Sequence, residues 1–199
     1  MHVRAPAILV AARQHGETAV VARFFTEEFG IVAGYVAGGR GRNLRPVMIP
    51  GNLVDLQLSA RSASQLPFAR VELTESRGPW LAEPLPAAAI GWITALTASA
   101  LPEREPYPPL FSALEGTLSA ICHAPSARGW ASALLGYEVL LLRELGYGGA
   151  GERPQGEMAQ VLEAMDALGP ALDHYLLADR RADVMAARNR LRELLGRIA

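Results

Sequence analysis

The chain has 199 residues, 50% of them hydrophobic, and its 19 basic residues, all arginine, face 20 acidic ones for a formal net charge of −1. A chain of this length can bury one good core or two small ones. Its near-neutral charge excludes a protein coated in basic surface, so any site for a polyanion has to be a local patch. Cys122 is the single cysteine, which excludes an intrachain disulfide and a cysteine-rich zinc site and fits a reducing cytoplasm.

The charge is unevenly distributed along the chain. Residues 1–80 contain nine arginines and six acidic residues, whereas residues 81–199 contain ten arginines and fourteen acidic residues. The positive charge therefore lies toward the N-terminal end. The apolar run near the N-terminus is too short for a secretory signal.

The first 76 residues have the pattern of a β-domain. Two apolar runs, 8–14 and 18–25, are separated by HGE, which is typical of a hairpin loop, and a third run, 30–37, follows after TEEF. Segments 52–60 and 68–76 alternate between apolar and polar residues. Five short strands in about 75 residues predict a small barrel of the OB type, although strand number alone leaves an SH3-like barrel or a sandwich open.

From Trp80 onward the spacing of apolar residues becomes helical, with helical runs at 87–101, 109–124 and 129–146 and an apolar face along 184–198. Residues 84–102 carry no charge, but their alanines and polar threonines predict a buried helix rather than one that spans a membrane. We therefore predict an α+β protein of two domains. An N-terminal five-stranded OB-type β-barrel covers residues 1–77, and an all-helical C-terminal domain covers residues 78–199.

The glycine-rich segment from Gly34 to Gly41 does not match a nucleotide-binding phosphate loop. Such a loop requires G-x-x-x-x-G-K-[ST], but here Gly39 is followed by Arg40 and Gly41. No lysine is available for the β- and γ-phosphates, and no hydroxyl for Mg²⁺. The segment also does not lead into a predicted helix whose N-terminus could receive the phosphate.

The sequence contains no catalytic constellation. It has no G-x-S-x-G elbow, and its four histidines are scattered. Cys122 and His123 are neighbours, but neighbouring side chains on a helix point in different directions and do not form a nucleophile–base pair. Cys122 is expected to be a small core residue. The sequence therefore favours a binding function.

Three arginines, Arg40, Arg42 and Arg45, lie in the glycine-rich loop after the third predicted strand. Glycine lets a backbone come close to a phosphate, and arginine binds phosphate through its planar fork. This loop is therefore predicted to contact a nucleic-acid backbone. The arginines of the last helix, Arg188 to Arg197, are a second candidate, although a solvated outer face explains them as well.

A second part of the predicted interface lies on the first two strands. Arg23 and Phe25 share a face of one strand, and Leu9, Ala11 and Arg13 share a face of the other. Guanidinium groups that follow a phosphate backbone, together with rings on which bases stack, are typical of sequence-tolerant single-strand binding. The predicted DNA-binding residues are Arg40, Arg42, Arg45, Arg13, Arg23 and Phe25. A structural interpretation stays open, in which the aromatic residues are core and the arginines only solubilise a loop.

Several stretches resemble the RecO family of bacterial recombination mediators. Residues 16–41 (GETAVVARFFTEEFGIVAGYVAGGRG) and 42–61 resemble the N-terminal domain of that family. Residues 101–121 (LPEREPYPPLFSALEGTLSAI) and 137–148 resemble its helical domain, and ALDHYLL with AARNRLRELL resembles its last helices. The resemblance covers nearly the whole chain in the same order, which makes it more specific than any single motif.

The resemblance implies an OB-fold followed by a helical domain and a non-enzymatic role in DNA repair and recombination. The protein would bind single- and double-stranded DNA, anneal complementary strands and help load the recombinase onto strands coated by single-strand-binding protein. Implied partners are the RecR mediator and the C-terminal tail of single-strand-binding protein, with no cofactor, small-molecule substrate or membrane. The protein would be cytoplasmic and nucleoid-associated during repair. The basic loop of the family corresponds here to Arg40, Arg42 and Arg45.

The sequence departs from the family at one place. Many RecO-like proteins carry a four-cysteine zinc module between the helical bundle and the last helices, whereas here a short loop without cysteine, residues 146–156, takes that place. No bound metal is therefore expected. An alternative function stays open: a protein-interaction adaptor of a repair complex with little DNA affinity, which the net charge and the sequence pI near 6.4 favour.

Overall fold

The structure, a computed structural model, describes residues 2–60, 62, 65–148, 157–178 and 184–199. It contains two compact units, Met1–Pro79 with Leu101–Phe111, and Trp80–Ala100 with Ser112–Ala199. Compared with the predicted domains 1–77 and 78–199, the main difference is that Leu101–Phe111 belongs to the first unit. From residue 149 onward, the predicted loop 146–156 lies outside the described residues.

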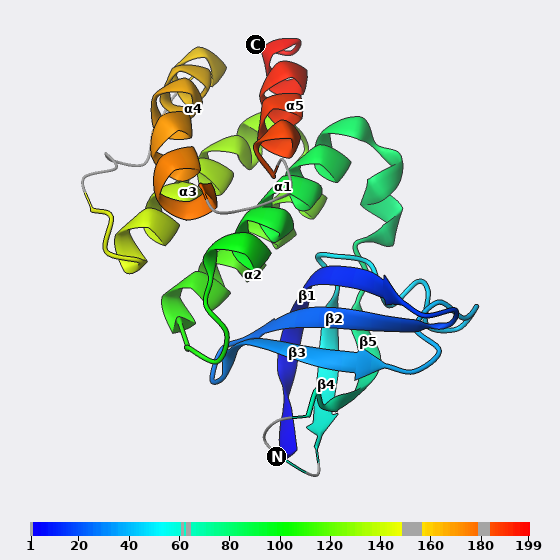
Figure 1. The fold of residues 1–199 in the computed structure, drawn as a ribbon. Helices are drawn as coiled ribbons and strands as arrows, with labels where there is room; N and C mark the ends of the chain where they lie inside the picture. The colour runs from blue at the N-terminus through cyan, green and yellow to red at the C-terminus, as the bar shows by residue number, and fades with distance from the viewer. Residues whose placement is uncertain (1, 61, 63–64, 149–156, 179–183) are drawn as a thin grey trace. The chain divides into compact units, whose positions relative to one another are not determined.

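The first unit is a closed barrel of five strands with the order β1-β2-β3-β5-β4 (Figure 1). The strands are β1 (His2–His15), β2 (Ala19–Thr26), β3 (Gly30–Val36), β4 (Leu53–Ser59) and β5 (Phe68–Glu75). Four of the pairings are antiparallel, and the long β1 pairs with β4 through its first half and with β2 through its second half. The barrel closes through a short parallel pairing of β3 with β5 at Tyr35 and Phe68. The predicted OB-type barrel followed by helices is confirmed.

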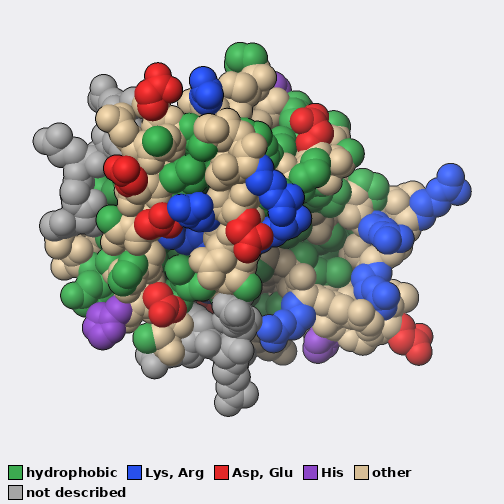
Figure 2. All heavy atoms as spheres, turned by 90° about the horizontal axis from the view of Figure 1, so that it is seen from above, with side chains coloured by type: hydrophobic (Ala, Val, Ile, Leu, Met, Phe, Trp, Pro, Cys, Tyr) green, Lys and Arg blue, Asp and Glu red, His purple; other side chains and the backbone are tan. Residues whose placement is uncertain are grey.

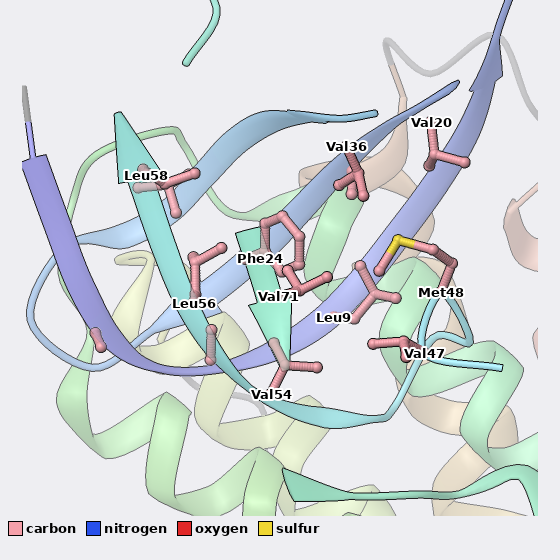
Figure 3. Close-up of a cluster of buried hydrophobic side chains, with 14 of the residues drawn as sticks. Leu9, Val20, Phe24, Val36, Val47, Met48, Val54, Leu56, Leu58 and Val71 are labelled. Carbon is pink, nitrogen blue, oxygen red and sulfur yellow. The ribbon is translucent and has the colours of Figure 1, made fainter. Parts of the chain in front are cut away.

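Alternation along the strands fills the barrel. On β4, Val54, Leu56 and Leu58 are buried in the core while the residues between them are partly exposed, as the sequence predicted. Val47 and Met48, from the connection between β3 and β4, complete the core at one end (Figure 3). Part of the β3–β4 connection therefore belongs to the barrel core.

One part of the predicted strand pattern is wrong. The pairing of β1 with β2 shifts between Leu9 and Ala11, which leaves Val10 as an extra residue in β1. Leu9 pairs with the core residue Phe24 and lies inside the barrel. Because a bulge reverses the alternation that follows it, Ala11 and Arg13 lie on the outer face, opposite to Leu9.

The second unit is helical. It contains most of α2 (Pro108–His123) together with α1 (Pro84–Ala100), α3 (Ala131–Glu144), α4 (Met158–Leu172) and α5 (Val184–Gly196). Short turns flank these helices: 3-10 turns at Gly78–Ala82 and Ala127–Gly129, and a π-helical turn at Asp173–Leu177. Among the described residues, no helix has both the length and the apolarity needed to cross a membrane.

A buried polar cluster connects three helices of this unit. Glu138 on α3 accepts hydrogen bonds from Trp92 Nε1 on α1 at 2.7 Å and from the guanidinium of Arg188 on α5 at 2.9 and 2.7 Å. Glu138 is fully buried, and Arg188 is 3% exposed. Thr97 on α1 and Tyr137 on α3 share a hydrogen bond of 2.7 Å, and burial raises the pKa of the tyrosine. These contacts satisfy the polar groups that are buried between the helices.

Candidate nucleic-acid interface

The connection between β3 and β4, residues 37–52, has an ordered backbone of consecutive turns. Gly38 has a φ of +66°, a conformation that favours glycine, and its carbonyl accepts a hydrogen bond of 2.8 Å from the amide of Gly41. The Gly41 carbonyl then accepts from the amides of Leu44 and Arg45, at 3.2 and 2.9 Å. We call residues 37–52 the β3–β4 loop. Its glycines form defined turns, so the arginines sit on an organised support.

Asn52 anchors the far end of the β3–β4 loop. Its side chain is fully buried, and Nδ2 donates to the carbonyls of Pro46 and Val47 at 2.9 and 3.1 Å. Its Oδ1 accepts a hydrogen bond of 2.7 Å from the backbone amide of Arg77, which follows β5. One asparagine thus ties the loop to the end of the last strand. Sequence reasoning missed this residue because an asparagine after Pro-Gly resembles an ordinary turn residue.

The three predicted loop arginines are all exposed. No Asp or Glu occurs between Glu28 and Asp55, so no acidic residue of the loop or of β3 offsets their charge. Among the residues that the structure describes, neither Arg42 nor Arg45 makes an ion pair. The chain has no lysine, so every blue side chain in Figure 2 is an arginine. On the face shown there, arginines project at the right-hand edge with few acidic side chains beside them.

Arg40 connects the loop to the hairpin between β1 and β2. Its backbone amide donates to the carbonyl of Thr18 at 3.0 Å, and its Nη1 donates to the carbonyl of Glu17 at 2.8 Å. The same hairpin carries Arg13, which is exposed near the end of β1. Arg13 therefore lies on the strand that leads into the hairpin to which the loop is hydrogen-bonded. Arg40, Arg42, Arg45 and Arg13 form what we call the arginine cluster.

Phe25 does not face solvent, and this corrects the prediction. It lies on the outer face of β2 together with Arg23, as expected, but it is fully buried. Its ring contacts that of Phe111 edge-on, with 5.6 Å between centroids. In this structure Phe25 therefore cannot stack on a base, and the alternative interpretation of this ring as a packed residue is the correct one. Arg23 forms an ion pair of 3.6 Å with Glu103, and its side chain is 27% exposed.

The segment Leu101–Phe111 is what covers this part of the barrel. Ile31 on β3 forms a bridge with Glu103, and its carbonyl accepts a hydrogen bond of 2.8 Å from the amide of Arg104. At the start of β3, Gly30 has a φ of +64°, and a Cβ there would lie 1.9 Å from the carbonyl oxygen of Glu105. The close approach of two backbones thus requires glycine at this position.

Two exposed or partly exposed rings near the barrel closure were not predicted as site residues. The rings of Tyr35 on β3 and Phe68 on β5 are in edge-on contact, with 5.4 Å between their centroids. The Tyr35 ring also makes an edge-on contact with the imidazole of His15, with 5.8 Å between centroids. Phe68 is 62% exposed. The alternation of β5 did place Phe68 on the same face as Arg70, so a signal existed. Phe68 could be recognised as a site residue only from the pairing of β3 with β5, which cannot be predicted from the sequence.

The arginines of the last helix are mostly engaged elsewhere. Arg188 is buried against Glu138, and Arg190 forms an ion pair with Glu193 at 3.4 Å. Arg192 makes two hydrogen bonds to Asp166 on α4, at 3.0 and 2.7 Å, and these lower the pKa of the Asp166 carboxyl. This helix is therefore a weaker candidate for a basic surface than the arginine cluster.

Comparison with known proteins agrees with this architecture. The family model for the N-terminal part of recombination protein O matches residues 1–77, and the model for its C-terminal part matches residues 84–151. A DNA repair protein RecO from Rhodospirillum centenum is 34% identical over 230 aligned positions, which cover 92% of this chain and 90% of the relative. Because this chain has only 199 residues, at least 31 of those 230 positions have no counterpart in it.

Two further relatives match over a shorter span. The DNA repair protein RecO of Phenylobacterium zucineum is 37% identical over 71% of this chain and 58% of the relative, and that of Paracoccus denitrificans is 37% identical over 71% of this chain and 57% of the relative. The chain thus spans less than two thirds of these two relatives. The two family models and the first relative together cover nearly all of the chain, and the chain belongs to the RecO family of DNA repair proteins.

Proposed function

We propose that this protein binds DNA through the arginine cluster of its barrel and acts as a mediator of DNA repair and recombination without catalysing a covalent reaction. The observation that carries the proposal is the β3–β4 loop, which presents three exposed arginines on a hydrogen-bonded support in a stretch without acidic residues. Arginine binds phosphate through paired hydrogen bonds as well as charge. Such a patch binds a polyanion although the net charge of the whole chain is −1.

A backbone-directed grip is suited to the roles implied by the family. Contacts to phosphate carry no sequence information, so they accept single and double strands of any sequence. Neutralised phosphates also allow two complementary strands to approach each other, which supports strand annealing. We propose that the protein anneals complementary strands in the cytoplasm and helps load the recombinase onto strands coated by single-strand-binding protein. The proposed partners are RecR and the C-terminal tail of single-strand-binding protein.

The test is binding of a labelled single-stranded oligonucleotide across a salt series. The triple variant Arg40→Ala, Arg42→Ala, Arg45→Ala is expected to bind more weakly than the parent. On a single strand each neutralised phosphate contributes a slope of roughly 0.7 in log affinity against log salt, so losing three contacts should flatten the slope by about 2. A matched control replaces three exposed arginines of the helical unit, Arg128, Arg143 and Arg190, and removes the same net charge. Equal loss in both triple variants would contradict the assignment of the loop.

A second comparison tests the limits of the cluster. Arg13→Ala removes an exposed guanidinium of the cluster, whereas Arg23→Ala removes one that is paired with Glu103. Weaker and less salt-dependent binding is expected for the first variant, and near-parental binding for the second. Arg23→Ala as damaging as Arg13→Ala would mean that the covered face of the barrel opens to bind DNA.

The adaptor function is the second candidate. It is favoured by the net charge of −1 and by exposed apolar side chains on the barrel, Leu66 and Phe68, which would suit a protein partner. The same salt series separates the two. Well-folded protein that binds no DNA at low salt would support the adaptor, because a phosphate-binding patch is strongest under that condition.

A further inference from the structure

The outer face of the barrel carries a continuous row of side chains across its strands. The row follows the strand pairing: Arg13 on β1 pairs with Val21 on β2, Val21 with Tyr35 on β3, and Tyr35 with Phe68 on β5. Paired residues point to the same side of a sheet, and neighbouring strands lie about 4.8 Å apart, so the row from Arg13 to Phe68 runs about 14 Å along the sheet. It therefore leads from the arginine cluster to the two rings at the barrel closure.

The row continues past Phe68, and a parallel one lies beside it. Phe68 pairs with Ser59 on β4, which in turn pairs with His2 at the start of β1. At a distance of two residues on each strand, Arg70 pairs with Gln57, and Gln57 with Arg4. Arg70 is exposed, and Arg4 forms an ion pair of 3.1 Å with Asp55. Guanidinium groups thus lie on both sides of the rings.

Phe68 stands between two hollows of the surface. One, of about 950 Å³, is lined by Tyr35, Phe68 and Leu66 with the polar side chains of His2, Ser59 and Gln65. The other, of about 600 Å³, lies on the Arg70 side and is lined by Phe68, Gln57, Arg4 and Arg70 among others. The Phe68 ring lines both hollows and is 62% exposed, so it is accessible to a planar ligand.

We propose that Tyr35 and Phe68 form a base-stacking site for single-stranded nucleic acid, continuous with the arginine cluster. This inference rests on the proposed DNA binding and adds to it a second type of contact, to bases rather than to phosphates. A strand held by Arg13 and the β3–β4 loop runs along the row, and an unpaired base stacks on the exposed ring of Phe68. Base–aromatic stacking accepts any base, since every base has a π-face.

The chemistry of the hollows favours a base over an apolar peptide side chain. The lining of the larger hollow combines aromatic rings with an amide, a hydroxyl and an imidazole that can hydrogen-bond base edges. The guanidinium groups on either side can hold the phosphates that precede and follow a stacked base. A duplex keeps its bases stacked on one another, so the proposed site discriminates in favour of single strands.

The experiment compares a labelled oligothymidylate with an abasic oligonucleotide of the same length, which has the same phosphates but no bases. Wild type is expected to bind the oligothymidylate more tightly. Phe68→Ala should lower that affinity at least about five-fold, which corresponds to 1 kcal/mol, and leave binding of the abasic strand and the salt slope unchanged. Phe68→Trp should retain the affinity, and its added fluorescence should be quenched by oligothymidylate but not by the abasic strand. Leu73→Ala, which removes an exposed apolar side chain from the same strand outside both hollows, is the matched control and should change neither affinity.

Each contrary outcome overturns a distinct claim. If wild type binds both oligonucleotides equally and with strong salt dependence, DNA binding stands and the stacking site is wrong. If wild type binds neither, the proposed DNA binding fails together with the stacking site. If Phe68→Ala instead lowers the sedimenting mass and leaves the preference for bases intact, the hollow is a self-association surface and the stacking site is wrong.

Discussion

Replacing Asn52 by alanine is expected to lower the free energy of unfolding of the barrel by about 3 kcal/mol. The side chain makes three hydrogen bonds, to the carbonyls of Pro46 and Val47 and from the amide of Arg77, and it is fully buried. A typical intramolecular hydrogen bond contributes about 1 kcal/mol net, and a buried donor or acceptor left without a partner costs about 1–3 kcal/mol. The decrease in the free energy of unfolding should therefore be no smaller than the summed net contributions of three ordinary hydrogen bonds.

The assay is denaturant unfolding of the full chain, with Asn43→Ala as the matched control. Asn43 is an exposed asparagine of the same β3–β4 loop, so its replacement should change the free energy of unfolding by less than about 0.5 kcal/mol. The Asn52 variant should also bind DNA more weakly, although Asn52 is buried, because the support of the loop arginines is loosened. Equal stability of the two variants would refute the reasoning that Asn52 anchors the loop.

Three further changes test other contacts by denaturant unfolding. Gly30→Ala should lower the free energy of unfolding by about 2 kcal/mol more than Gly38→Ala. Both glycines have positive φ, but only at Gly30 would a Cβ lie against the backbone of the covering segment, and equal decreases would contradict that close approach. Arg188→Met should lower the free energy of unfolding by about 3–5 kcal/mol, because the buried carboxylate of Glu138 loses its positively charged partner. A decrease below about 1 kcal/mol would mean that the pair is not buried in solution. The pKa of Asp166 is lowered in the folded state, so its stabilisation is present above the ordinary value of 3.8 and is lost as the pH falls through the folded-state pKa. Asp166→Asn should therefore cost at most about 1 kcal/mol at neutral pH, since the pair is exposed, and the difference should vanish in acid; a pH-independent difference would contradict this.

The parts of the fold that follow from local pattern could be predicted from the sequence. The alternation of β4 assigned its inward and outward residues correctly, because a strand with one buried face has a period of two. The clustering of arginine and glycine after β3 identified a loop whose arginines are exposed. Each of these features depends only on residues that are neighbours in the chain.

The features that could not be predicted depend on contacts between distant residues. The extra residue Val10 reverses the alternation of β1, and nothing in the apolar run ILVAA marks its position. The burial of Phe25 depends on Phe111, which lies far along the chain. The adjacency of Tyr35 and Phe68 depends on a parallel pairing of β3 with β5 that involves one residue pair. In each case the missing information was a tertiary contact.

These contacts divide the outer face of the barrel into a covered part and an open part. Three residues of β2 point outward: Val21, Arg23 and Phe25. The alternation of the strand alone predicts that all three are equally exposed. The segment Leu101–Phe111 covers the end that contains Phe25 and pairs with Arg23, whereas the row through Val21 leads to Arg13 on one side and to the exposed ring of Phe68 on the other. Within the first unit, the position of that segment therefore decides which of these outward residues of β2 are covered. A nucleic acid that binds this barrel without displacing the segment has the open rows beside the β3–β4 loop as its surface, where arginines and aromatic rings occur together.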